Sequence, residues 1–181
     1  MEILIIGGII VLIMVIVSTK VKSSAAEAFR PEVVAKDGFI IEKPEGFMYP
    51  LRDKPDFPFE AYSKLFGEKM TRNIWRARTR LRITDGANLQ KLVDEIKSDE
   101  EENFVSEKIL SDLPDGKKGI IIRTEKTESD FDDNVDYKIF RKIIESDKHG
   151  KTYELRSTLL KAYAEEYTDR ICRMMESFRL K

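Results

Sequence analysis

The sequence predicts an α+β protein in which an N-terminal transmembrane helix precedes a single domain with a twisted, largely antiparallel sheet flanked by helices. Three observations support this prediction. Residues 3–17 form an uncharged apolar run. Residues 74–83 alternate apolar and arginine side chains with the period of a strand. Residues 162–178 carry apolar side chains at the spacing of an amphipathic helix.

The apolar run is long enough to anchor the chain in a membrane. Extended to Val21 it has nineteen residues, which as an α-helix would reach ~28 Å, close to the hydrocarbon thickness of ~30 Å. We therefore expect residues 1–22 to be a transmembrane anchor, with residues 3–19 in the lipid bilayer. The alternative is a signal peptide cleaved near residues 26–28. Glu2 before the run and lysines directly after it favour the uncleaved anchor.

The flanking charges also predict an orientation. Lys20, Lys22 and Arg30 follow the run, whereas only Glu2 and the terminal amine precede it. Because lysine and arginine mark the cytoplasmic side, we expect a cytoplasmic main domain, the alternative being a periplasmic or lumenal one. Residues 23–36 are expected to be a juxtamembrane linker, and residues 37–181 the soluble α+β domain.

Composition limits the functions that this domain can have. Charged residues make up 36% of the chain, yet the net charge is −1. Such balance argues against a nucleic-acid partner and favours a solvated surface that carries both signs. The single cysteine, Cys172, excludes an internal disulfide framework and a zinc site built from several thiolates. We expect no cofactor and no metal.

The elements of the domain follow from local patterns. Pro44-Glu45-Gly46 predicts a turn after the first strand, and the proline-rich residues 44–58 are expected to be extended and packed on their own domain, the alternative being a partner-binding segment. A hairpin is expected between residues 137–145 and 151–159, and its turn contains His149-Gly150. The expected order is strand 36–43, helix 59–70, strand 74–83, helix 88–98, strand 104–110, strand 119–126, acidic loop 127–136, a hairpin of 137–145 with 151–159, and helix 162–178.

The strand 74–83 carries the most distinctive chemistry in the chain. Period-two alternation predicts that Trp75, Ala77, Thr79, Leu81 and Ile83 share one face. The opposite face would then hold four arginines, which could bind phosphates, acidic lipid headgroups or an acidic partner. The alternative is pairing with acids on neighbouring strands, such as Glu125 or Glu154. The candidate anion-binding residues are Arg76, Arg78, Arg80 and Arg82.

Other candidate sites are weaker. Residues 130–136 imitate the start of a calcium-binding EF-hand loop, but Val135 stands where glycine is needed and Arg141 where the bidentate glutamate is needed. The only histidine, His149, falls in the expected hairpin turn, and Cys172 lies beside the apolar stripe of the last helix. The sequence holds no nucleophile elbow, phosphate-binding loop or dinucleotide fingerprint. We therefore predict no catalytic residues.

Two stretches resemble the PsbP/DcrB-type domain. Residues 38–47, Gly-Phe-Ile-Ile-Glu-Lys-Pro-Glu-Gly-Phe, are similar to that family's opening strand and its Pro-Glu-Gly-aromatic turn. The strand at 119–122, the hairpin, Gly150-Lys-Thr-Tyr-Glu-Leu and the closing helix resemble its C-terminal half. The resemblance spans about residues 37–180 and implies a twisted antiparallel sheet with helices on both faces. It also implies a non-enzymatic protein that assists membrane complexes or binds partner proteins, usually outside the cytoplasm.

Together these observations predict a single-pass, membrane-anchored, non-catalytic interaction module, an accessory or assembly subunit of a membrane protein complex. Two alternatives stay open: a binder of anionic surfaces through the arginine strand, and a hydrolase that uses clustered carboxylates.

Overall fold

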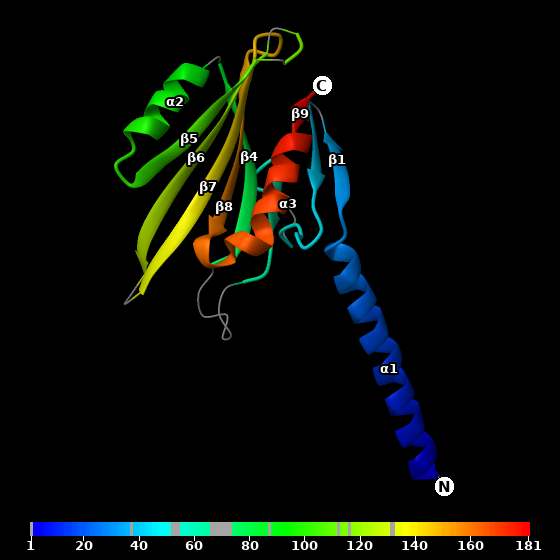
Figure 1. The fold of residues 1–181 in the computed structure, drawn as a ribbon. Helices are drawn as coiled ribbons and strands as arrows, with labels where there is room; N and C mark the ends of the chain where they lie inside the picture. The colour runs from blue at the N-terminus through cyan, green and yellow to red at the C-terminus, as the bar shows by residue number, and fades with distance from the viewer. Residues whose placement is uncertain are drawn as a thin grey trace.

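A computed structural model describes residues 2–36, 38–51, 55–65, 74–86, 88–111, 113–115, 117–130 and 133–181, with residues 2–9, 25, 130 and 133 described for their backbone alone. The chain folds as an α+β protein, as expected (Figure 1). The elements are α1 (Glu2–Ala28), β1 (Glu32–Lys36), β2 (Phe39–Lys43), β3 (Phe59–Tyr62), β4 (Ala77–Asp85), α2 (Leu89–Ser98), β5 (Glu102–Leu110), β6 (Lys118–Asp130), β7 (Asp133–Ser146), β8 (Lys151–Leu160), the 3₁₀ helix η1 (Lys161–Tyr163), α3 (Ala164–Ser177) and β9 (Arg179–Leu180).

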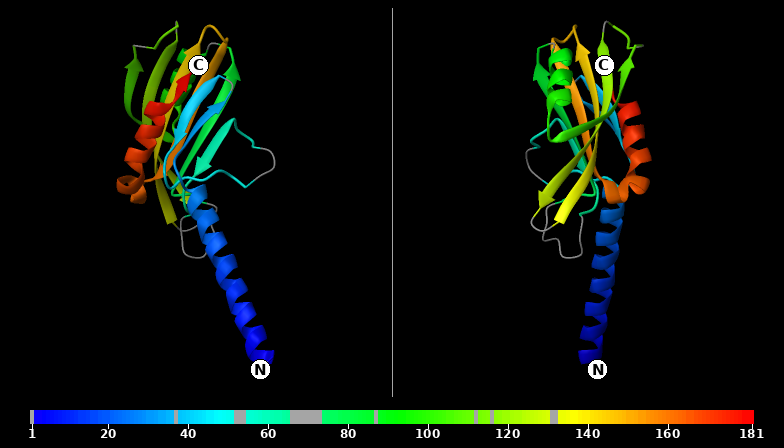
Figure 2. Two further views of the ribbon diagram at one scale, coloured as in Figure 1. Left: turned by 90° about the vertical axis from the view of Figure 1, so that its right-hand side faces the viewer. Right: turned by 60° about the vertical axis from the view of Figure 1, so that its left-hand side comes forward.

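The described strands form two antiparallel sheets. The larger has six strands in the order β3-β4-β8-β7-β6-β5, and the smaller has three in the order β1-β2-β9. The second panel of Figure 2 shows the large sheet between α2 on one face and α3 on the other. The expected sheet with helices on both faces is thus confirmed, and it is divided into two.

The main core lies between the large sheet, α3 and the small sheet. Ile41, Leu81 and Ile171 are fully buried there, as is Phe47, whose ring meets the edge of Tyr167. Leu155 of β8 completes the layer under α3. A smaller cluster of Val93 and Ile96 from α2 with Ile120, Ile122 and Ile143 covers one end of the opposite sheet face. The rest of that face is not covered by α2.

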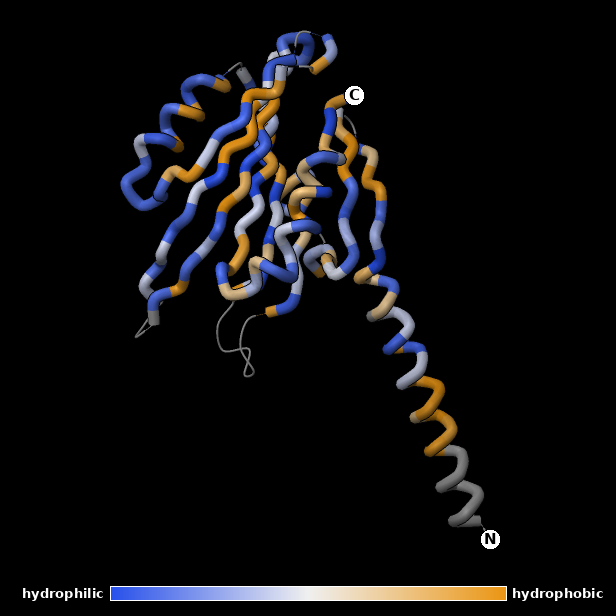
Figure 3. The backbone as a smooth tube through the Cα atoms, viewed as in Figure 1, coloured by the Kyte–Doolittle hydropathy of each residue, from blue (hydrophilic) through white to orange (hydrophobic). Residues whose placement is uncertain are grey.

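Helix α1 projects away from the domain (Figure 1). Figure 3 shows its apolar stretch, and the side chains from Ile10 to Val17 are each about half exposed or more. Among the described side chains, which begin in this helix at Ile10, no helix is both long enough and apolar enough to cross a membrane.

Residues 23–36, the expected juxtamembrane linker, have regular secondary structure. Residues 23–28 continue α1 without a break, and residues 32–36 form β1, which pairs along its whole length with β2. Buried Lys43 joins the helix to the domain, because its ammonium group donates to the carbonyl oxygens of Ala28, Arg30 and Phe47. The Gly46 amide donates to the Phe29 carbonyl at 2.9 Å. The charge of Lys43 also complements the C-terminal end of the helix dipole.

Two predicted elements are wrong. Phe59–Tyr62 is strand β3, not the start of a helix, since Phe59 and Ala61 are buried at strand spacing and the segment pairs with β4. Residues 66–70 of that expected helix lie outside the described residues. The expected acidic loop 127–136 is the distal part of the β6–β7 hairpin. Cross-strand hydrogen bonds from Thr127 to Asp136 and from Ser129 to Asn134 stabilise it despite its polar composition.

The other predicted elements are confirmed. Helix α2, strands β2, β5 and β6, the hairpin of β7 with β8, and the closing helix α3 all lie where the sequence pattern placed them, with boundaries shifted by a few residues. The proline-rich segment contributes to its own domain: Phe47 is buried, Tyr49 packs against Phe59, and Met48 bridges to Tyr62. Leu51, by contrast, is 90% exposed.

Candidate functional site

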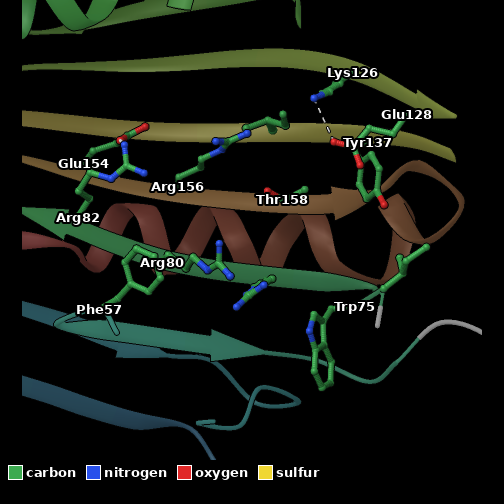
Figure 4. Close-up of a pocket in the computed structure, with 13 residues that line it drawn as sticks. Phe57, Trp75, Arg80, Arg82, Lys126, Glu128, Tyr137, Glu154, Arg156 and Thr158 are labelled. Carbon is green, nitrogen blue, oxygen red and sulfur yellow. Dashed lines mark ion pairs between the residues drawn. The ribbon is translucent and has the colours of Figure 1, made fainter. Parts of the chain in front are cut away.

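The open face of the large sheet holds a cavity of about 360 Å³ (Figure 4). Its floor consists of residues from β4 and β8, and Lys126, Glu128 and Tyr137 of β6 and β7 lie at one side. Aromatic side chains of Phe57 and Trp75 line the opposite side. The cavity thus combines cationic groups with aromatic rings.

Three of the four predicted arginines line this cavity: Arg78, Arg80 and Arg82. Arg76 does not. The chain bends at Arg76, and its guanidinium group lies 4.3 Å from the centre of the Tyr163 ring and 3.9 Å from a Glu166 carboxylate oxygen.

Because of this bend, the predicted position of Trp75 on the face of Ala77 is wrong. Its ring lies on the arginine side of the sheet, 3.8 Å from the Tyr62 ring centre, whereas Ala77, Thr79 and Leu81 face the core as expected. Period-two alternation holds only along β4, which begins at Ala77.

Carboxylates on neighbouring strands pair with these arginines. Glu60 of β3 accepts hydrogen bonds through its Oε1 from Arg78, with an Nε distance of 2.8 Å, and from Arg80 Nε at 3.1 Å. Arg82 lies 3.9 Å from Glu154 of β8, one of the two acids that the sequence indicated. The other, Glu125, pairs with Lys161. The predicted helix at 59–70 gave no reason to pair Glu60 with the arginines. The observed strand β3 places Glu60 directly opposite Arg80.

A buried ion pair continues the network across the sheet. Arg141 of β7 donates to both oxygens of Glu102, at 2.6 and 2.7 Å, and both side chains are 4% exposed. Arg156 of β8 donates to the same carboxylate at 3.2 Å, and Thr124 donates to it at 2.6 Å. Arg141 and Arg156 were not predicted as site residues. The predicted hairpin of 137–145 with 151–159 places Leu155 opposite Arg141, and the observed register is shifted by one residue so that Arg156 lies there.

The surroundings of the two buried glutamates keep them ionised. Burial alone raises the pKa of Glu60, but the hydrogen bonds and charges of Arg78 and Arg80 outweigh it, and the net pKa is lowered. For Glu102 the same burial effect is outweighed by hydrogen bonds from Arg141 and Thr124, so its pKa is also lowered. These carboxylates are therefore anions that position guanidinium groups, and not proton donors at neutral pH.

The remaining candidates lie apart from the cavity. His149 is exposed in the β7–β8 turn, and Cys172 is half-buried on α3, where burial raises the pKa of its thiol. Within the EF-hand-like stretch, Asn134 and Asp136 are paired across the hairpin, and residues 131–132 lie outside the described part. No group of three or more metal-ligating side chains gathers within the described residues.

Comparisons with known proteins concern the fold. No protein-family model matches the chain, and no curated protein does. The solution structure of cyanobacterial PsbP from Synechocystis sp. PCC 6803 matches over 84% of this chain and 92% of that one, with 9% identity and a TM-score of 0.44. The crystal structure of LpqN, involved in cell envelope biogenesis of Mycobacterium tuberculosis, matches over 84% of this chain and 91% of that one, with 11% identity and a TM-score of 0.55.

The match to LpqN shows that this chain shares its fold with a solved structure over most of its length, and the resemblance that the sequence indicated concerns the fold alone. At such low identity, the likeness carries no residue roles from either protein to this chain.

Proposed function

We propose that this chain is a membrane-attached, non-catalytic interaction module that serves as an accessory or assembly subunit of a membrane protein complex. One observation carries the proposal. The side chains from Ile10 to Val17 are apolar and exposed on a helix that projects from the domain, and the preceding residues 3–9 are uncharged. Burying such a surface in lipid would contribute about 25 cal/mol per Å² of apolar area.

The junction between helix and domain supports the same function. Lys43 ties the last turn of α1 to the turn at 44–47, and Gly46 adds a backbone hydrogen bond. These contacts hold the domain against the end of the helix, so an attached helix would present the domain in a defined orientation at the membrane.

The chemistry of the open sheet face favours binding over catalysis. Glu60, Glu102 and Glu154 are each paired with arginine, and the pKa values of Glu60 and Glu102 are lowered. A carboxylate hydrolase needs a carboxyl group whose pKa is raised so that it can donate a proton. The described cavity supplies cations and aromatic rings, which are binding groups, and its two lining carboxylates, Glu128 and Glu154, are paired with Lys126 and Arg141.

Membrane attachment is tested with the full-length chain expressed in cells. Alkaline carbonate washing of the membranes should leave the wild type in the pellet and release the double variant Leu12→Lys/Val15→Lys. Val33→Lys is the matched control, because Val33 is also apolar and 66% exposed but lies on β1. Release of the wild type with the variant would refute the attachment.

The accessory role and the side of the membrane need two further measurements. A tagged full-length chain extracted in mild detergent should copurify with a stoichiometric membrane complex that survives in salt, and migration as a lone monomer would contradict this. Protease treatment of sealed vesicles tests the cytoplasmic orientation that Lys20, Lys22 and Arg30 favour. If the domain survives when protease is added from the cytoplasmic side, it is periplasmic or lumenal instead.

A further inference from the structure

Three arginines stand in one row across neighbouring strands. Arg80 of β4 is directly opposite Arg156 of β8, and Arg156 is directly opposite Arg141 of β7. Directly opposed residues of an antiparallel pair have Cβ atoms ~4.5–5.5 Å apart, and like charges in such positions are destabilising. This row therefore needs anions beside it.

The described acids that pair with these arginines supply only part of the neutralising charge. Among the described residues, three carboxylates, of Glu60, Glu102 and Glu154, serve five guanidinium groups: those of Arg78, Arg80, Arg82, Arg141 and Arg156. At the mouth of the cavity, Lys126 pairs with the more exposed acids Glu101 and Glu128. The five guanidinium groups and three carboxylates have a net charge of +2, which falls to +1 when Lys126 and its two acids are included.

The excess charge lies where a ligand can reach it. The side chains of Arg80 and Arg156 are 38% and 43% exposed, whereas that of Arg141 is 4% exposed. The exposed part of Arg156 is not its Nε atom, which is buried and has no hydrogen-bond acceptor within the described part of the chain. Arg82 is 64% exposed, and its distance of 3.9 Å from Glu154 is longer than a hydrogen bond.

We propose that this cavity binds a phosphate group between Arg80 and Arg156, with Arg78 and Arg82 beside it. A phosphate monoester carries a charge of roughly −1.5 to −2 at neutral pH and three acceptor oxygens, whereas a carboxylate has one charge and two oxygens. The cavity of about 360 Å³ also has room for the group that bears the phosphate, next to Phe57 and Trp75.

The phosphate can belong to a soluble ester or to a phospholipid headgroup. The inference deepens the proposed function, since it names the ligand chemistry of a non-catalytic module. Its test needs neither a partner protein nor an intact membrane, so its failure and the failure of membrane attachment are distinguishable.

The test uses the full-length protein in neutral detergent at constant ionic strength. Glycerol 3-phosphate is the soluble probe, and mixed micelles with phosphatidic acid are the lipid probe. Trp75 lines the cavity and is the only tryptophan in the chain, so its emission reports the site. Equilibrium dialysis with radiolabelled glycerol 3-phosphate gives a second measurement that does not depend on fluorescence.

We expect saturable binding that weakens at least ~tenfold in Arg80→Gln and in Arg156→Gln, because each change removes charged hydrogen-bond donors. Arg179→Gln, an exposed arginine on β9, should bind as the wild type does. Each test variant loses a like-charge contact but also a hydrogen bond to a buried glutamate, so its folding is checked by circular dichroism before binding is measured. If either fails to fold by circular dichroism, Arg82→Gln at the exposed end replaces it.

Saturable binding of glycerol 3-phosphate, with or without binding of the lipid probe, would assign a soluble phosphate ester. Saturable binding of the lipid probe alone would assign a phospholipid headgroup. The absence of saturable binding to either probe would overturn the proposal. So would unchanged affinity in Arg156→Gln, or saturation by a glutamate-rich peptide without any response to phosphate.

Discussion

Replacing Glu102 by alanine should destabilise the protein strongly, because it leaves the charge of Arg141 buried. Both side chains are 4% exposed, and the pair shares two hydrogen bonds of 2.6 and 2.7 Å. Removing one partner of a buried pair costs ~3–5 kcal/mol. Arg141 would keep Thr124 at 2.9 Å and Glu154 at 3.4 Å, so we expect the lower end of that range.

Urea unfolding of the full-length chain in detergent at neutral pH measures this cost through Trp75 emission. The double variant Glu102→Ala/Arg141→Met should lose less than the sum of the two single variants, since it removes both buried charges. The slope of free energy against urea must stay constant for the comparison to hold. A cost below about 1 kcal/mol for Glu102→Ala, or no coupling in the double variant, would show that the pair does not organise this sheet face.

Three further predictions concern pH, a turn and the core. Burial lowers the pKa of Lys142 from 10.5 to about 8. Above pH 8 the folded protein therefore loses the Lys142 proton while the unfolded chain keeps it, and the free energy of unfolding should rise by about 1 kcal/mol between pH 7 and 9. Urea titrations should show no such rise for Lys142→Met. Gly46→Ala should cost about 1–3 kcal/mol in the same assay, because φ is +86° and the end of the Arg170 side chain must also shift away from the new Cβ. Gly150→Ala should cost less, because its φ of +58° lies in the ordinary left-handed region and its Cβ meets no atom within 4 Å. Phe47→Ala, at a fully buried ring, should cost about 3–5 kcal/mol, whereas Leu51→Ala, at 90% exposure, should stay within ~0.5 kcal/mol; equal costs for those two variants would contradict the assigned core.

The pH prediction separates the charge of Lys142 from its hydrogen bonds. Its amine donates to the carbonyl oxygens of Met175 and Phe178, each at 2.7 Å, at the C-terminal end of α3. A neutral amine still has two hydrogens, so both bonds can persist after deprotonation. A stability that instead falls between pH 7 and 9, relative to Lys142→Met, would show that the folded protein favours the charged form.

Local sequence patterns were sufficient for much of the fold. Strands with a strict alternation, such as β4 from Ala77 onward, and helices with a continuous apolar stripe, such as α3, were predicted because side-chain period alone decides which face is buried. The prediction failed where two periods compete over a short stretch. The apolar side chains of Phe59–Tyr62 are compatible with the period of a helix and with that of a strand. Only the pairing of this segment with β4 decides for the strand.

The candidate site divides in the same way. The sequence by itself determined that arginines repeat along one face of a strand and that an uncharged run opens the chain, since both are properties of neighbouring residues. Only the tertiary structure decided that Arg76 turns away, that Glu60 and Glu102 neutralise part of the charge, and that Arg141 and Arg156 extend the row. Those facts depend on strand register and on a bend, which join residues far apart in the chain and leave no local signal.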